Sequence, residues 1–215
     1  DDGSPDMENS IELVKFMTAL GYKKIITTPH IMSDMYPNDR DTILQKLDEL
    51  RTAVKSAGIE TEIYAAAEYF LDDHVAGLLK NNEPLLTISG NMVLVEFSLA
   101  NQPMILKEII YEMQMRGYQP VIAHPERYQY LEYDKPFYED LKDLGCLFQL
   151  NILSLGNYYG KSAHKLANYL IKKEYYDLVG TDLHHPRHAE ALNDPSLAGP
   201  LWKLLETGKI RNSQL

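Results

Sequence analysis

The sequence has little of three things: cysteine, long apolar runs and basic charge. Its one cysteine, Cys146, excludes a disulfide framework within the chain and favours a reducing, cytoplasmic setting. No apolar run approaches the ~20 residues that a membrane-spanning helix needs, and no basic segment followed by an apolar one opens the sequence. We therefore expect no insertion into a membrane.

The chain has 21 Lys and Arg against 31 Asp and Glu, which gives a formal net charge of −10. Nucleic-acid and anionic-lipid surfaces select basic proteins, so we expect neither as a partner. A small local positive site for an anionic substrate is still compatible with this charge. The length of 215 residues and the 45% hydrophobic content predict one globular domain.

Two kinds of segment alternate along the chain. Apolar residues at helical spacing, often followed by glycine, predict helices at 5–20, 40–57, 72–80, 102–116, 135–144, 162–173 and 200–207. Short apolar runs between them predict strands at 24–28, 62–66, 92–95, 119–123, 146–150 and 177–181. The apolarity of the runs is continuous rather than alternating, which indicates strands that are covered on both faces. We expect a parallel α/β sheet or barrel.

Five of the apolar runs lead into side chains that commonly bind metals. In a parallel barrel the carboxyl ends of all strands open on one face, so these side chains would converge there. Crowded carboxylates repel one another, and a divalent cation removes that repulsion. Oxygen and imidazole ligands without thiolate suit manganese, iron, zinc or magnesium. The candidates are His30, Glu68, Glu96, His124, Asp182 and His184.

Each candidate also has a structural alternative. His30 follows a proline and could bond to the backbone of a loop, and His124 or Asp182 could cap the next helix. Glu68 and Glu96 could each pair with a lysine. Five strand ends of the right residue type are harder to explain by five unrelated structural roles.

Arg127 and Arg187 each lie three residues after a candidate histidine. A guanidinium can donate two parallel hydrogen bonds to a phosphate, so the two arginines indicate a phosphate ester as the ligand. The alternative is an ion pair with a nearby carboxylate, Glu126 or Glu132 for Arg127 and Glu190 for Arg187.

Other aromatic and histidine residues give weaker indications. Tyr128 or Tyr158 could stack on an aromatic substrate, although most of the tyrosines are expected to pack between helices and sheet. His74, His164 and His188 do not follow a strand, and we expect them on the surface.

The motifs that carry these residues resemble the PHP (polymerase and histidinol phosphatase) superfamily. More narrowly, they are similar to its bacterial protein-tyrosine phosphatases, which regulate capsule and exopolysaccharide synthesis. The resemblance runs along nearly the whole chain in the right order, and the ordered set is far more specific than any one motif. The motifs are Asp1-Asp-Gly-Ser4, Thr27-Thr-Pro-His-Ile31, Ala66-Ala-Glu-Tyr-Phe70, Val95-Glu-Phe-Ser98, Ile122-Ala-His-Pro-Glu-Arg-Tyr128 and Gly180-Thr-Asp-Leu-His-His-Pro-Arg187.

The resemblance implies a distorted seven-stranded βα barrel, TIM-like and of PHP type, as a single domain over residues 1–215. The family has a His-x-His pair on a first strand before the Asp-Asp-Gly motif, so we expect this domain to lack that strand at its N-terminus. Two to three divalent ions, usually manganese with iron or zinc as alternatives, are implied for the intact protein. By motif, the ligands would be Asp2, His30, Glu68, Glu96, His124, Asp182 and His184, with Glu68 bridging.

Asp2 enters this set only through the resemblance, because its position alone indicates no more than a cap on the first helix. The resemblance also implies that Arg127 and Arg187 hold the phosphate. The expected activity is metal-dependent hydrolysis of a phosphomonoester, with the phosphotyrosine tail of a bacterial tyrosine autokinase as substrate and partner.

Three other functions stay open at this point. They are a small-molecule phosphatase of the histidinol-phosphate type, a truncated module that binds phosphotyrosine without catalysis, and an amidohydrolase-like enzyme. The strand edges left by an absent first strand would also allow a homo-oligomer, in which another chain covers the edge.

Overall fold

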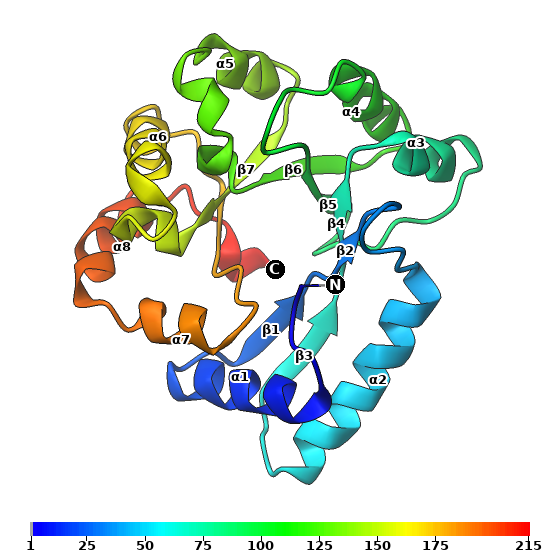
Figure 1. Ribbon diagram of the computed structural model, residues 1–215, viewed down its shortest axis with the longest axis vertical. Coiled ribbons are helices and arrows are strands. Elements are labelled where there is room, and N and C mark those ends of the chain that lie inside the picture. The colour runs from blue at the N-terminus through cyan, green and yellow to red at the C-terminus, as the bar shows by residue number, and fades with distance from the viewer. Residues whose placement is uncertain (1) are drawn as a thin grey trace.

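The computed structural model describes residues 2–215, which form an α/β fold with parallel strands inside and helices outside (Figure 1). Asp1, which begins the first quoted motif, lies outside this range. A two-stranded parallel sheet pairs β1 (Lys24–Thr27) with β3 (Glu62–Ala65). A six-stranded parallel sheet has the order β2 (His30–Ile31), β4 (Glu68–Phe70), β5 (Met92–Glu96), β6 (Gln119–Ala123), β7 (Leu147–Asn151) and β8 (Leu178–Gly180).

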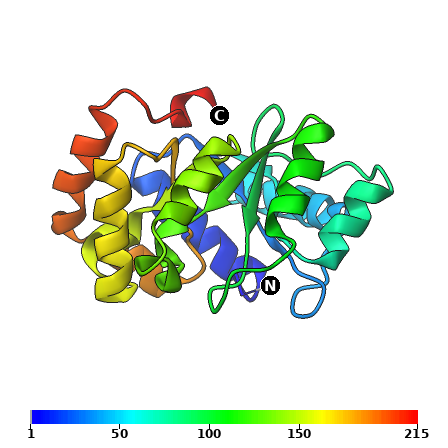
Figure 2. The ribbon, with the colours of Figure 1, turned by 90° about the horizontal axis from the view of Figure 1, so that it is seen from above.

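The helices surround the strands, and α1 contacts both α2 and α7, so that the ring of helices closes (Figures 1 and 2). No helix in the described part of the chain has the length and apolarity to cross a bilayer. The α-helices are α1 (Met7–Ala19), α2 (Arg40–Ser56), α3 (Asp73–Lys80), α4 (Leu106–Met115), α5 (Pro136–Asp143), α6 (Gly160–Lys172), α7 (Pro186–Leu192) and α8 (Ala198–Leu205). The 3-10 helices are η1 (Pro125–Arg127), η2 (Gln129–Glu132), η3 (Ile152–Gly156), η4 (Pro195–Leu197) and η5 (Asn212–Gln214).

Hydrophobic residues alternate between two buried layers along the strands of the large sheet. Val93 and Val95 of β5 belong to the main core with the surrounding helices, whereas Leu94 belongs to a separate cluster. In β6, Ile122 likewise belongs to the main core and Val121 to the separate cluster. The expectation of strands covered on both faces is therefore confirmed for β5 and β6, but it is wrong for β3, where Glu62 and Tyr64 are exposed.

The first predicted strand, 24–28, is observed as β1, and a second short strand that was not predicted, β2, begins after Pro29. Proline has no amide to donate to a strand ladder, so regular pairing is interrupted at this residue. Its carbonyl still accepts from the Glu68 amide at 3.0 Å, and His30 then pairs in register with Glu68. Both candidate ligands lie within short strands, not in the loops that follow them.

The predicted strands and helices agree with the observed ones apart from their ends and a few local features. Helix α7 was not expected, because its seven residues contain no apolar repeat. The N-cap of α1 is Asp6, whose carboxylate accepts from the Asn9 amide, so the helix begins two residues later than the predicted range of 5–20. Within residues 2–215, β8 pairs only with β7 and β2 only with β4, so the large sheet does not close, and the seven-stranded barrel of PHP type stays a prediction.

A side chain covers part of the second edge of β8. The Asn212 amide oxygen accepts from the Val179 amide at 2.9 Å, and its amide nitrogen donates to the Val179 carbonyl at 2.8 Å. Asn212 thus makes the two bonds that a neighbouring strand would make.

We expect Asn212→Ala to lower the free energy of unfolding by about 1–3 kcal/mol, because two backbone groups lose their partners. Urea denaturation measures the loss. Gln214→Ala, at an exposed residue of the same 3-10 helix, is the matched control. An equal effect in both variants would contradict this role of Asn212.

Candidate metal centre

The carboxyl ends of the strands bring all seven candidate ligands together. His30 joins the N-terminal segment to β5: its Nδ1 lies 3.2 Å from Asp2 Oδ1 and its Nε2 lies 3.4 Å from Glu96 Oε1. His124 continues the series, with its Nε2 at 3.7 Å from Glu96 Oε2 and 3.2 Å from Glu68 Oε1. Side chains from four strand ends and the N-terminal segment are therefore in contact.

A second branch of contacts starts again from Asp2. His184 Nε2 lies 3.2 Å from Asp2 Oδ1, and His184 Nδ1 lies 3.4 Å from Asp182 Oδ1. Asp182 Oδ2 in turn accepts from Arg127 Nη1 at 2.8 Å. The contacts form one unbroken series from Glu68 to Arg127.

The backbone is strained at two of these residues. His124 has φ +33 and Asp182 has φ +49, a left-handed conformation that residues other than glycine rarely adopt. Each such residue costs on the order of 1–3 kcal/mol and persists only where the surroundings impose it. His124 directly follows β6, and Asp182 lies two residues after the end of β8.

The donor set fits a divalent cation. Two groups of three side chains, Asp2–His30–His184 and His30–Glu68–Glu96, offer ligand atoms within 4.8 Å of one another. Among the buried side-chain atoms of residues 2–215, Glu68 Oε1 and His124 Nδ1 have no hydrogen-bond partner. Unsatisfied buried polar atoms are costly, and a cation would satisfy a carboxylate oxygen of this kind. The donors are oxygen and imidazole nitrogen without thiolate, as manganese, iron, zinc and magnesium accept.

Burial and mutual repulsion set the charges in the cluster. Burial, together with the nearby Glu68, raises the pKa of Glu96 to about 7. Burial alone would lower the pKa of His124, but Glu68 outweighs it and raises this pKa above its ordinary value. Burial would raise the pKa of Asp182, but His124, His184 and Arg127 hold it below the usual range. These opposed shifts show that each charge in the cluster depends on its neighbours.

The raised pKa of Glu96 predicts a pH dependence of stability in the metal-free protein. The folded state binds this proton more tightly than the unfolded state, so the free energy of unfolding falls as pH rises from about 4.5 to 7. The loss attributable to Glu96 is at most roughly 3 kcal/mol.

Thermal unfolding of the metal-free protein across this pH range tests the dependence. Glu96→Gln should flatten the decline, whereas Glu60→Gln, at an exposed carboxyl, should leave it unchanged. A decline that is the same in wild type and Glu96→Gln would show that Glu96 is not its source.

The two arginines predicted to hold phosphate lie in different surroundings. Arg127 pairs with Asp182, not with Glu126 or Glu132, and its guanidinium lies 4.5 Å from the centre of the Tyr159 ring. Arg187 is exposed in the first turn of α7, and no ion pair involves it in the described part of the chain. The structure brings only Arg127 into contact with the cluster.

Sequence reasoning missed Asn151 at the end of β7. Its amide nitrogen donates to Asp182 Oδ2 at 2.9 Å, and its backbone amide donates to the fully buried Glu126 carboxylate at 2.9 Å. Glu126 also accepts from the Tyr176 hydroxyl at 2.9 Å. A polar residue at the end of an apolar run was the available indication, but an amide is not a typical metal ligand.

Two aromatic residues differ from expectation. His188, which we expected on the surface, is buried; its Nδ1 accepts from the His184 amide at 3.2 Å. Burial and the nearby His185 lower the pKa of His188 to about 4, so its ring is neutral. Tyr128 is fully buried and stacks on Phe97 with ring centres 3.9 Å apart, so it cannot stack on a substrate.

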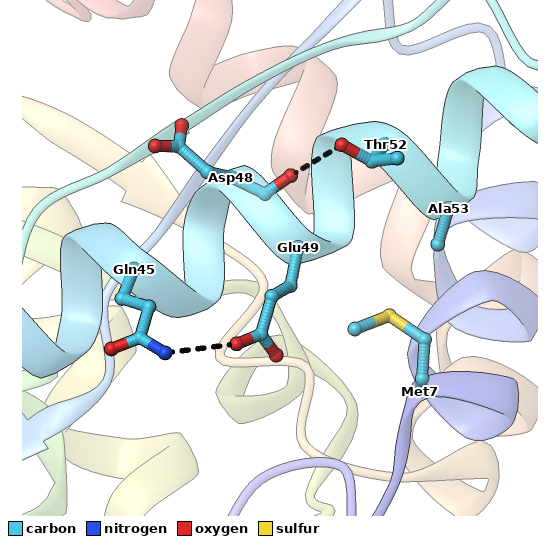
Figure 3. A pocket seen from close by; sticks show the side chains of 6 residues that line it. All are labelled: Met7, Gln45, Asp48, Glu49, Thr52 and Ala53. Carbon is cyan, nitrogen blue, oxygen red and sulfur yellow. Dashed lines mark hydrogen bonds between the residues drawn. The ribbon is translucent and has the colours of Figure 1, made fainter.

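A surface hollow of about 640 Å³ lies elsewhere, between α1 and α2 (Figure 3). It is lined by Met7 and one face of α2. Gln45 donates to Glu49 there, and Thr52 donates to the Asp48 carbonyl, so these polar groups are satisfied within the helix. This hollow shows no chemistry that compares with the cluster at the strand ends.

Comparison with known proteins places the chain among similar sequences and folds. The chain is 26% identical over 185 residues to tyrosine-protein phosphatase YwqE of Bacillus subtilis (strain 168), covering 86% of this chain and 73% of that one. It is 29% identical over 191 residues to tyrosine-protein phosphatase CpsB of Streptococcus pneumoniae, covering 86% and 78%.

The fold is also similar to a solved one. A chain from the crystal structures of YwqE from Bacillus subtilis and CpsB from Streptococcus pneumoniae, described as unique metal-dependent tyrosine phosphatases, superimposes with a TM-score of 0.80 and 25% identity. The match covers 99% of this chain and 90% of that one. A family model for capsular polysaccharide synthesis, CpsB/CapC, matches residues 1–197, and the chain therefore belongs to the CpsB/CapC family.

Proposed function

We propose that this chain is a metal-dependent protein-tyrosine phosphatase, a hydrolase of phosphomonoesters that acts in capsule or exopolysaccharide synthesis. The observation that carries the proposal is the series of contacts from Glu68 through Asp2 to Arg127. It combines a cation-binding donor set with a guanidinium, which is what a phosphate ester needs. The names of the relatives agree with this reading.

In this proposal, the seven clustered side chains hold two to three divalent ions, and manganese is the first candidate. Bound divalent cations make a nucleophile available from water near neutral pH and withdraw charge from phosphoryl oxygens. His30 belongs to both groups of possible ligands, so it would contribute to holding the ions in either group. Glu68, whose Oε1 is buried without a hydrogen bond, is the proposed bridging carboxylate.

Arg127 is proposed to hold a phosphoryl oxygen. One terminal nitrogen of Arg127 donates to Asp182, and the guanidinium group lies over the face of the Tyr159 ring. Asn151 holds the same carboxylate oxygen, so that Asp182 cannot turn away. Arg187 would approach the phosphate from the first turn of α7. A phenol has a pKa of about 10, so the leaving group of phosphotyrosine needs little protonation.

The proposed substrate and partner is the phosphotyrosine tail of a bacterial tyrosine autokinase in the cytoplasm. A complete PHP-type barrel of seven strands, or a homo-oligomer that covers the free edges of β2 and β8, would both be consistent with the observed pairing.

Phosphate release from a phosphotyrosyl peptide tests the proposal. The protein is stripped with chelator and then assayed alone and with manganese, iron or zinc. We expect release that depends on added metal and is lost on chelation. Parallel assays with histidinol phosphate separate a small-molecule phosphatase from the proposed one. Binding of the peptide without release, in a protein shown to hold metal, would instead favour a non-catalytic module.

A further inference from the structure

A row of aromatic rings leads from the surface to the candidate metal centre. We call Tyr158, Tyr159, His188 and His184 the aromatic wall. The ring centres of Tyr158 and Tyr159 lie 5.1 Å apart, and those of Tyr158 and His188 lie 5.3 Å apart. His188 is 5.6 Å from His184, one of the clustered donors. Each of these pairs is edge to face, an arrangement that aromatic rings favour.

Tyr158 is the most exposed member of the wall. The Arg127 guanidinium lies over the Tyr159 ring, and the Tyr159 hydroxyl accepts from Asn151. His188 is buried. Tyr158 keeps 42% of its surface exposed, and its hydroxyl makes no hydrogen bond within residues 2–215.

Two residues with positive φ flank Tyr158 and Tyr159. Asn157, with φ +66, ends η3 in a left-handed conformation, and Gly160, with φ +90, opens α6. The two turns leave Tyr158 and Tyr159 in a short link that projects between the two helices. An exposed aromatic side chain in such a link is not needed for the core.

We infer that Tyr158 determines substrate class by contacting the phenyl ring of the phosphomonoester. The inference rests on the proposed function. In an aryl phosphate only one oxygen separates the phosphorus from the ring, so a phosphate held beside Arg127 brings the ring to the adjoining wall. Tyr159 already meets Arg127, and Tyr158 is the next ring outward. An aliphatic phosphate has no ring face to place there.

Direct binding to the metal-loaded protein tests this role without turnover. Isothermal titration calorimetry compares phenylphosphonate, which is not hydrolysed, with inorganic phosphate. Tyr158→Ala should weaken phenylphosphonate about tenfold, as expected for loss of an aromatic pair, and leave phosphate unchanged. Tyr158→Phe should bind both as wild type does. Tyr111→Ala, at an exposed tyrosine of α4, is the control for loss of a surface ring.

The results that would overturn the role of Tyr158 differ from those that would refute the phosphatase activity. Unchanged phenylphosphonate binding by Tyr158→Ala would overturn it, and so would equal weakening of both ligands. Wild-type protein that binds both ligands but releases no phosphate from any aryl ester would refute the proposed phosphatase and leave the binding comparison standing. Turnover kinetics then add a second readout, a raised KM for phosphotyrosyl peptide with kcat nearly kept.

Discussion

His124→Ala is expected to abolish metal-dependent phosphate release, with a loss of about 10³-fold or more. His124 contacts both Glu68 and Glu96, and its side chain is almost fully buried. Removing it leaves two crowded carboxylates with one fewer neutralising donor, and metal content should fall with activity. Glu68→Ala should have the same outcome for a different reason, because it removes the buried carboxylate that is proposed to bind the cations.

Metal content by atomic spectroscopy and phosphate release from the peptide measure this effect together. His74→Ala, at an exposed histidine of α3, is the matched control and should retain both. Near-normal turnover by His124→Ala or Glu68→Ala would refute the proposed site. Lost activity with full metal content would assign these residues a role other than ligation.

Arg127→Ala is expected to lower kcat/KM by about 10²–10³, the usual loss when one charge-stabilising donor is removed. The metal content should be kept. Arg127 contacts Asp182 and not the other donors, and without it the Asp182 carboxylate keeps its bond from Asn151 and is freer to bind a cation. The loss should therefore affect phosphate binding and rate, not assembly of the centre.

Arg116→Ala provides the control, because Arg116 pairs with Glu112 on α4, outside the strand-end cluster. If metal content falls together with activity in Arg127→Ala, the arginine serves to hold Asp182 in place. Retained activity would remove Arg127 from the proposed mechanism.

The fold was largely predictable because its elements are short and clearly marked. Each buried strand is a continuous apolar run, and glycines such as Gly117 and Gly145 end helices with positive φ. The short strand β2 and the helix α7 were missed because neither segment has a repeating apolar pattern. The tertiary structure decides both.

The candidate centre was predictable where residue type and strand end coincide. His124 and Asp182 were found in this way, although their left-handed backbone has no sequence signature. Asp2 depended on the family resemblance, because it precedes the first element. The contact of Arg127 with Asp182 joins residues 55 positions apart, and the rings of Tyr158 and Tyr159 that face His188 come from the distant link between η3 and α6. Such contacts exist only after folding.

The spacing of the clustered side chains along the chain has a consequence for folding. Asp2 and His184 touch at 3.2 Å although nearly the whole sequence lies between them. A cation shared by such residues would act as a cross-link that closes a very long loop, and no fragment of the chain would bind it in the same way. Binding at 100 times Kd would add about 2.7 kcal/mol to stability by mass action. The supply of metal would then govern how long the protein survives proteolysis, as well as how fast it works.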